Sequence, residues 1–232
     1  MAEINCGGRT TREINAEIRR AISAGDGEVV LKDPGARHNL AVAILDPANI
    51  RIAGSAGYFC GGLIDGAHIV VEGSAGWGLA ESMMSGEVTV RGSAGNGAAA
   101  AIRGGTVVIH GDAAARLGVS MKGGTVLVAG NCGYMAGFMG QKGRLVVCGD
   151  AGDAFADSMY ETVGFVGGSI AGLGTDAVIE TPTGEDAGWL DATLAQYLPE
   201  VKRRGTQFKK VVSGRKLWNF DKREWKVWQE AL

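Results

Sequence analysis

The chain has 232 residues, of which 46% are apolar, and its formal net charge is −2. This length and composition suit one sizeable hydrophobic core with appendages, and the near-neutral charge gives no indication of nucleic-acid binding. No apolar run approaches the roughly eighteen residues of a membrane-spanning helix, and the start MAEINCGGRTTREIN lacks an apolar signal segment. We therefore expect a soluble, cytoplasmic protein.

Residues 1–27 read as an N-terminal segment with a capping helix. Ile14, Ile18 and Ile22 are four residues apart, Thr10 precedes the pattern and Gly25 follows it. Apolar residues at this spacing line one face of a helix, and glycine commonly ends one. The spacing predicts a helix over residues 11–25.

The central part, residues 28–180, is dominated by a repeat. Six consecutive segments begin at residues 49, 68, 87, 106, 125 and 144, each nineteen residues after the last. Each carries a glycine at its sixth position: Gly54, Gly73, Gly92, Gly111, Gly130 and Gly149. Residues 28–48 resemble a longer, imperfect first turn, and residues 164–180 a degenerate last one. A fixed period of this length indicates a solenoid, whose terminal repeats are usually irregular.

Aligned by position, the repeats predict one short strand per unit. The second and fourth positions hold branched apolar residues, as in Ile69 and Val71, which point to the same side of a strand. The third position mixes Arg51, Thr89 and Val146, which suits an outer face. The strand then ends at the repeated glycine, which we expect to turn the chain at a positive φ.

Two further positions predict inward-facing stacks. The eighth position is always small (Ala56, Ala75, Ala94, Ala113, Cys132, Ala151), and the sixteenth is mostly apolar (Ile64, Met83, Ile102, Met121, Gly140, Met159). Glycines near the end of each unit mark another corner: Gly66, Gly86, Gly105, Gly124 and Gly143. Nineteen residues are too few for a crossover helix plus a strand, so the pattern predicts an all-β fold, a parallel β-helix of about seven to eight coils. Left-handed β-helices usually repeat an aliphatic hexapeptide; a single VxV strand with glycine corners favours the right-handed form.

The character of the chain changes in its third part, residues 181–232. TPTGEDAGW reads as a turn-rich linker and LDATLAQYLPEV as a short helix, followed by a basic, aromatic tail. Residues 201–232 hold ten Lys and Arg against three acidic residues, and four of the five tryptophans lie from Trp189 onward. The tail could lie back on the acidic rod or contact a partner subunit. For the second case the expected interface residues are Trp218, Phe220, Trp225 and Trp228, because aromatic residues dominate binding hot spots.

The sequence shows no convincing catalytic, cofactor-binding or metal-binding constellation. The best polar candidates occupy the seventh position (Ser55, Ser74, Ser93, Asp112, Asn131, Asp150), where such residues more often cap backbone N–H groups. Asp153 and Asp157 add carboxylates near Asp150, but the cysteines of the repeats do not align with one another, and neither do the histidines. GSAGWG resembles part of a dinucleotide fingerprint, yet no helix of adequate length follows it. We therefore expect no active site on this chain.

The repeated G-x-x-G-x-G phrase with VxV strands resembles the GXGXG domain of glutamate synthase large chains. The similarity covers roughly residues 50–180, including IRIAGSAGYFCGGLIDGAHIVVEGSAGWGLAESMMSG and MKGGTVLVAGNCG, and GGRTTREINAEI is similar to that family's lead-in. With the ending KLWNFDKREWKVWQEAL, the chain looks most like the free-standing GXGXG subunit of N-methylglutamate synthase and related complexes.

This resemblance implies a non-catalytic structural subunit of a hetero-oligomer. It would position a glutamine-amidotransferase-like subunit against an FMN-binding synthase subunit, so that an amine, ammonia or methylamine, passes between them. FMN, and an iron–sulfur cluster as a further candidate, would belong to a partner. The alternative is the C subunit of a formylmethanofuran dehydrogenase-like or formyltransferase/hydrolase complex. A stand-alone β-helix acyltransferase or lyase fits less well, because neither a hexapeptide repeat nor a carboxylate-and-arginine cleft is present.

Overall fold

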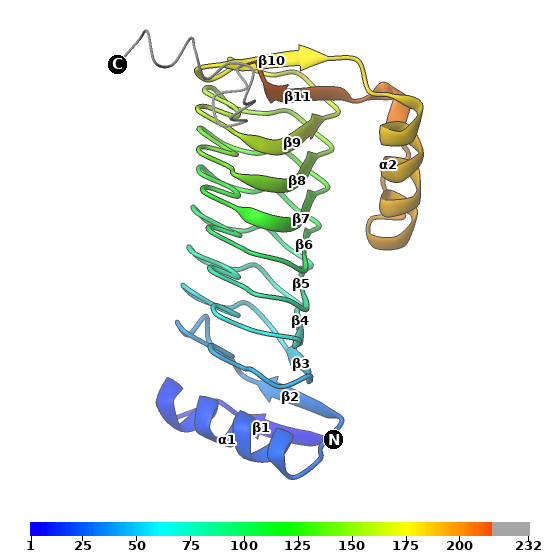
Figure 1. Ribbon diagram of the computed structural model, residues 1–232. Coiled ribbons are helices and arrows are strands. Elements are labelled where there is room, and N and C mark those ends of the chain that lie inside the picture. The colour runs from blue at the N-terminus through cyan, green and yellow to red at the C-terminus, as the bar shows by residue number, and fades with distance from the viewer. Residues whose placement is uncertain (215–232) are drawn as a thin grey trace, which may run out of the picture.

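The protein is a parallel β-solenoid of about seven turns with two helices, which confirms the predicted fold class. The computed structural model describes residues 1–214 (Figure 1). The parallel strands along the rod are β1 (Ala2–Asn5), β2 (Glu28–Lys32), β3 (Asn49–Ile52), β4 (His68–Val71), β5 (Glu87–Val90), β6 (Thr106–Ile109), β7 (Lys122–Val128), β8 (Lys142–Val147) and β9 (Glu161–Val166). The elements outside this stack are α1 (Thr11–Ser23), β10 (Ala177–Glu180), α2 (Gly184–Tyr197), the 3₁₀ turn η1 (Gly205–Gln207) and β11 (Lys209–Ser213).

The repeat fixes the strand register. From β3 to β9 each strand pairs in parallel with the strand of the next coil, nineteen residues later, so Ile50, Ile69 and Val88 stack directly above one another. These side chains are buried in a core that runs the length of the rod. The small eighth position forms a second contact line, since Ala56, Ala75 and the corresponding residues make single parallel bridges from coil to coil. Both inward stacks predicted from the sequence are present.

The third side of each coil contains left-handed residues that the sequence does not predict. Three alternate residues per coil lie in the left-handed region, as Gly78, Ala80 and Ser82 do with φ of 69°, 54° and 56°. Neighbouring coils hold these residues in place: the Ala80 N–H donates to Cys60 O at 2.8 Å, and the Ser82 N–H donates to Ala100 O at 2.8 Å. An isolated left-handed alanine is unfavourable, so the hydrogen bonds to both neighbouring coils maintain this arrangement.

The expectation of a positive φ at the repeated corner glycine is wrong for five of its six members. Only Gly54 has a positive φ, 149°; Gly73, Gly92, Gly111, Gly130 and Gly149 do not. Glycine is needed there because the coils approach too closely for a side chain. A Cβ on Gly92, for example, would lie 3.0 Å from the carbonyl carbon of Gly73 and would also overlap Ser74 Oγ. The left-handed glycines are those before each strand, such as Gly86 (φ 98°) and Gly105 (φ 78°).

The N-terminal segment closes one end of the solenoid. α1 begins at a capping box, in which the Thr10 side chain accepts the Glu13 N–H and Glu13 accepts the Thr10 N–H. Its buried Ile14 and Ile18 join the core of the rod, which confirms the predicted helix. β1, which sequence analysis did not identify, adds a parallel strand beside β2. A helix thus covers the apolar interior of the first coil, as a terminal repeat requires.

The C-terminal part folds back along the rod. α2 starts at Gly184, before the predicted LDATLAQYLPEV helix, because Thr183 and Asp186 form a capping box within what reads as a linker. β11 then pairs antiparallel with β9 on one side and with β10 on the other. The last turn is therefore completed by the C-terminal segment, and not by residues 164–180 alone. Of the two predicted positions for the tail, residues 201–213 adopt the one on the rod.

The outer strand face is covered along the later coils. The outward-pointing third residues Val108, Leu127, Val146 and Phe165 are buried in a second apolar cluster. Their partners are α2 residues and Phe208, together with Leu198, and α2 lies beside these strands in Figure 1. The third residues of β6 to β9 thus point outward from the coil as expected, but the C-terminal segment covers them.

Candidate functional site

The polar seventh position forms a ladder between coils. Each side-chain oxygen accepts the backbone N–H of the residue nineteen positions later: Ser74 N–H to Ser55 Oγ at 3.1 Å, and Asn131 N–H to Asp112 Oδ1 at 2.7 Å. At the end of the ladder Asp150 accepts the backbone and hydroxyl of Ser169, which lower its pKa. These side chains thus cap backbone N–H groups, as we expected. The capped groups belong to the next coil, so the side chains join the coils.

The remaining acidic, histidine and cysteine side chains are dispersed. Asp157 accepts the Ser158 hydroxyl and the Thr175 N–H, which lower its pKa. Within residues 1–214, no three His, Cys, Asp or Glu side chains are placed to share a metal ion. The four cysteines are free and buried, and burial raises the pKa of Cys60 to about 12. Buried thiols of this kind are poor nucleophiles.

An exposed set of large apolar side chains lies on the first coils, and we call it the aromatic face. It consists of Tyr58, Phe59, Leu63 and Trp77, whose exposed fractions are 40%, 45%, 52% and 52%. The rings are ordered by stacking, with centroids 4.4 Å apart for His38 and Tyr58 and 5.2 Å apart for Tyr58 and Trp77. The Tyr58 N–H also donates to His38 Nδ1 at 2.8 Å, which ties the first ring of the stack to the backbone. These contacts hold large rings at the surface in a fixed arrangement.

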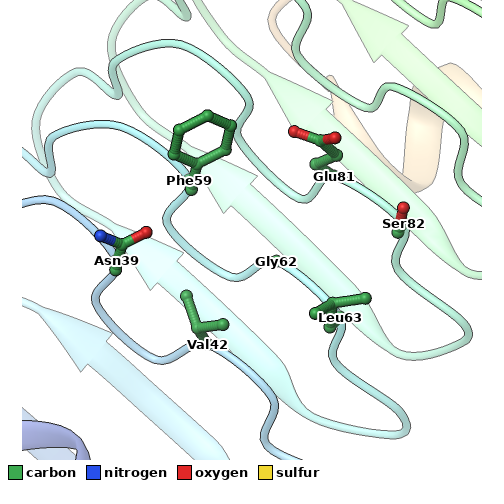
Figure 2. A pocket seen from close by; sticks show the side chains of 7 residues that line it. All are labelled: Asn39, Val42, Phe59, Gly62, Leu63, Glu81 and Ser82. Carbon is green, nitrogen blue, oxygen red and sulfur yellow. The ribbon is translucent and has the colours of Figure 1, made fainter. Parts of the chain in front are cut away.

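A hollow of about 280 Å³ lies beside Phe59 and Leu63 of this face. Figure 2 shows its lining, which comes from three successive coils: Asn39, Val42, Phe59, Gly62, Leu63, Glu81 and Ser82. The hollow exists because Gly62 has no side chain at the position that Val42 and Glu81 occupy in the neighbouring coils. A Cβ on Gly62 would be 3.5 Å from the nearest atoms, Glu81 O and Phe59 O, so neither crowding nor a positive φ demands glycine there.

Sequence analysis did not single out any residue of the aromatic face. The available signal is that Tyr58 and Trp77 share the tenth position of successive repeats, and that Phe59 and Leu63 are large at two positions that small residues hold in the next two repeats. The predicted interface residues Trp218, Phe220, Trp225 and Trp228 lie outside the described residues.

No family model matches the chain, and a search of curated proteins finds no match either. In the part of the chain that the structure describes, neither helix has the length and apolar character needed to cross a membrane.

Proposed function

We propose that this chain is a non-catalytic structural subunit of a glutamate-synthase-like complex of the N-methylglutamate synthase type. It holds a glutamine-amidotransferase-like subunit and an FMN-binding synthase subunit so that the amine released by one reaches the other. The FMN, and any iron–sulfur cluster, belong to the synthase partner. The resemblance of the nineteen-residue repeat to the GXGXG domain supports the choice of complex.

The observation that carries the proposal is the aromatic face. Large rings held at the surface by stacking are typical of protein interfaces, where tyrosine and tryptophan are enriched. The coils beneath them are joined by continuous ladders, so the face sits on a support suited to fixing the distance between two partners. The polar side chains that would be the obvious catalytic candidates are already used between the coils.

The proposal is tested by gentle purification of the native protein from its source cells, followed by identification of stoichiometric partners. We expect one amidotransferase-like protein and one yellow, FMN-containing protein in a fixed ratio with this chain. Isolation of the chain as a free monomer under the same conditions, or with FMN bound to the chain itself, would show that the proposal is wrong.

A second experiment tests the predicted role of the tail. Truncation after Gly214 removes Trp218, Phe220, Trp225 and Trp228 but keeps β11 complete. We expect the truncated subunit to retain its circular dichroism spectrum and to lose affinity for a partner in size-exclusion chromatography. Full assembly of the truncated chain with both partners would contradict the predicted contact between the tail and a partner subunit.

A further inference from the structure

The size of the hollow beside Phe59 restricts what it can hold. Small-molecule and cofactor sites in proteins commonly enclose roughly 300–1,000 Å³. The hollow has about 280 Å³ and opens on the surface of the rod, so it is too small to bury most of a nucleotide or flavin. Its dimensions suit a single large side chain inserted from a partner protein.

The lining indicates the chemistry of that side chain. Val42, Phe59 and Leu63 supply apolar walls, and the half-buried Glu81 contributes a carboxylate beside them (Figure 2). Among residues 1–214 the carboxylate of Glu81 has no ion-pair or hydrogen-bond partner. Covering a carboxylate with a purely apolar surface is costly unless a cation or donor accompanies that surface.

We propose that the hollow receives an aromatic side chain of a partner subunit, and that a lysine or arginine next to this side chain pairs with Glu81. The inference rests on the proposed function for the existence of a partner subunit, and adds to it where that subunit docks and by which residues. The aromatic anchor contacts Val42, Phe59 and Leu63, while the cation remains at the rim, where it gives selectivity against acidic segments.

The backbone around the hollow is suited to this role because it is ordered before the partner arrives. The Phe59 N–H donates to Trp77 O at 2.7 Å, and the Leu63 N–H donates to Glu81 O at 2.9 Å. Binding to such a surface immobilises few additional groups, which lowers the entropic cost of association.

The chemistry can be tested on the full chain without knowing the partner, using two small probes. Tryptamine carries an indole and a cation, whereas indole-3-acetate carries the same ring with an anion. We expect tryptamine to shift the amide NMR signals of Phe59, Leu63 and Glu81 saturably, and indole-3-acetate to bind more weakly. Glu81→Gln should weaken tryptamine binding about two- to fivefold, the range of an exposed ion pair, and abolish the preference for the cation.

Two glycine variants provide a matched control. Gly62→Ala adds only a Cβ, for which there is space, and should leave tryptamine binding nearly unchanged. Gly62→Leu places a branched side chain in the hollow and should abolish the shifts while the rest of the spectrum stays that of the folded protein. Absence of saturable shifts with tryptamine, or an equal response to indole-3-acetate, overturns the assignment.

The same variants separate this inference from the proposed function once the native complex is isolated. We expect Gly62→Leu to weaken assembly at least about tenfold, the factor that corresponds to loss of about 1.4 kcal/mol, while Gly62→Ala assembles normally. If the complex forms with the expected subunits and Gly62→Leu assembles as well as the wild type, the docking site is wrong and the proposed function stands. If no such subunits associate with the wild type, the proposed function is wrong, and the probe titration still decides the chemistry of the hollow.

Discussion

The early and late coils share one repeat but differ in what covers their strands. On β3 and β4 the outward third residues are Arg51 and Val70, and both stay partly exposed. On β8 and β9 the equivalent residues are Val146 and Phe165, and both are buried beneath the C-terminal segment. The positions of the repeat that face the core are the same in the two halves. The repeat thus determines the coil, while the outward residues determine which part of the coil needs a cover.

The same reasoning applies to the aromatic face. The large apolar residues at the outward third position of β6 to β9 coincide with a cover that the chain itself provides, α2. Phe59, Leu63 and Trp77 lie outside the early coils, and nothing in residues 1–214 covers them. Large apolar side chains exposed on neighbouring coils are a common feature of interaction sites. By analogy with α2, we infer that these side chains are covered by a segment outside residues 1–214 or by another protein.

The largest expected effect comes from a change that disrupts the support common to both halves. In Gly92→Val the new Cβ would lie 3.0 Å from the carbonyl carbon of Gly73, in backbone that cannot move without disturbing the ladder. We expect a loss above about 4 kcal/mol, or failure to fold, measured by chemical denaturation. Gly62→Ala, in a spacious position, is the control and should unfold like the wild type. A Gly92→Val protein of normal stability would contradict the close-approach explanation.

The next effect distinguishes the covered half from the uncovered one. Val146 is fully buried beneath the C-terminal segment, and Val146→Ala should cost about 1.5–3 kcal/mol through lost burial. Val70→Ala, at the equivalent outward position of β4, should cost less, because Val70 is partly exposed. Denaturant titration of both variants measures the difference. Equal losses at the two positions would show that the cover contributes little.

The sequence predicts this scaffold well because nineteen-residue spacing repeats every constraint six times. The sequence predicts features less well when they depend on one residue or on a few repeats. The covering role of α2 depends on Val108, Leu127, Val146 and Phe165 being apolar at an outward position, a trend visible only when the later repeats are read separately from the earlier ones. The hollow depends on one residue, Gly62, among 39 glycines.

The backbone conformation of several residues could not be predicted from the sequence either. Glycine at the sixth position suggests a left-handed turn, but the structure uses it for close approach. Conversely, Ala80 and Ser82 adopt left-handed angles that their residue types do not favour. In both cases contacts between coils outweigh the local preference of the residue. Such contacts cannot be assessed from one repeat in isolation.

A smaller effect is expected from the ladder that links the two halves. Asp112 accepts the Asn131 N–H at 2.7 Å and its side-chain amide at 3.2 Å. Asp112→Ala removes the acceptor from both donors and should cost about 0.5–1.5 kcal/mol, the net value of an ordinary hydrogen bond. Asp112→Asn keeps a carbonyl acceptor at this position, as Asn131 does in the next coil, and should recover most of the loss in a thermal melt. No recovery would indicate that the charge of Asp112, and not its acceptor, matters.

The smallest effect is a pH-dependent one at the start of the covering helix. Asp186 Oδ2 accepts Lys210 Nζ at 2.9 Å and the Thr183 N–H at 2.9 Å, which connects α2 to β11. Burial raises the pKa of Asp186, but the hydrogen bonds from Thr183 and Lys210 outweigh it and leave the pKa below its usual value.

Because the pKa of Asp186 is lower in the folded than in the unfolded state, the ionised carboxylate stabilises the fold at pH values above the unfolded pKa of about 3.9. This contribution is lost as the pH falls through the folded pKa. Amide hydrogen exchange of residues 184–197 should therefore be faster in Asp186→Asn than in the wild type at pH 6, and the difference should shrink toward pH 3. Glu185→Gln, an exposed neighbour on the same turn, should show no such trend. A difference that is constant between pH 6 and pH 3 would mean that Asp186 acts through helix capping alone, without its charge.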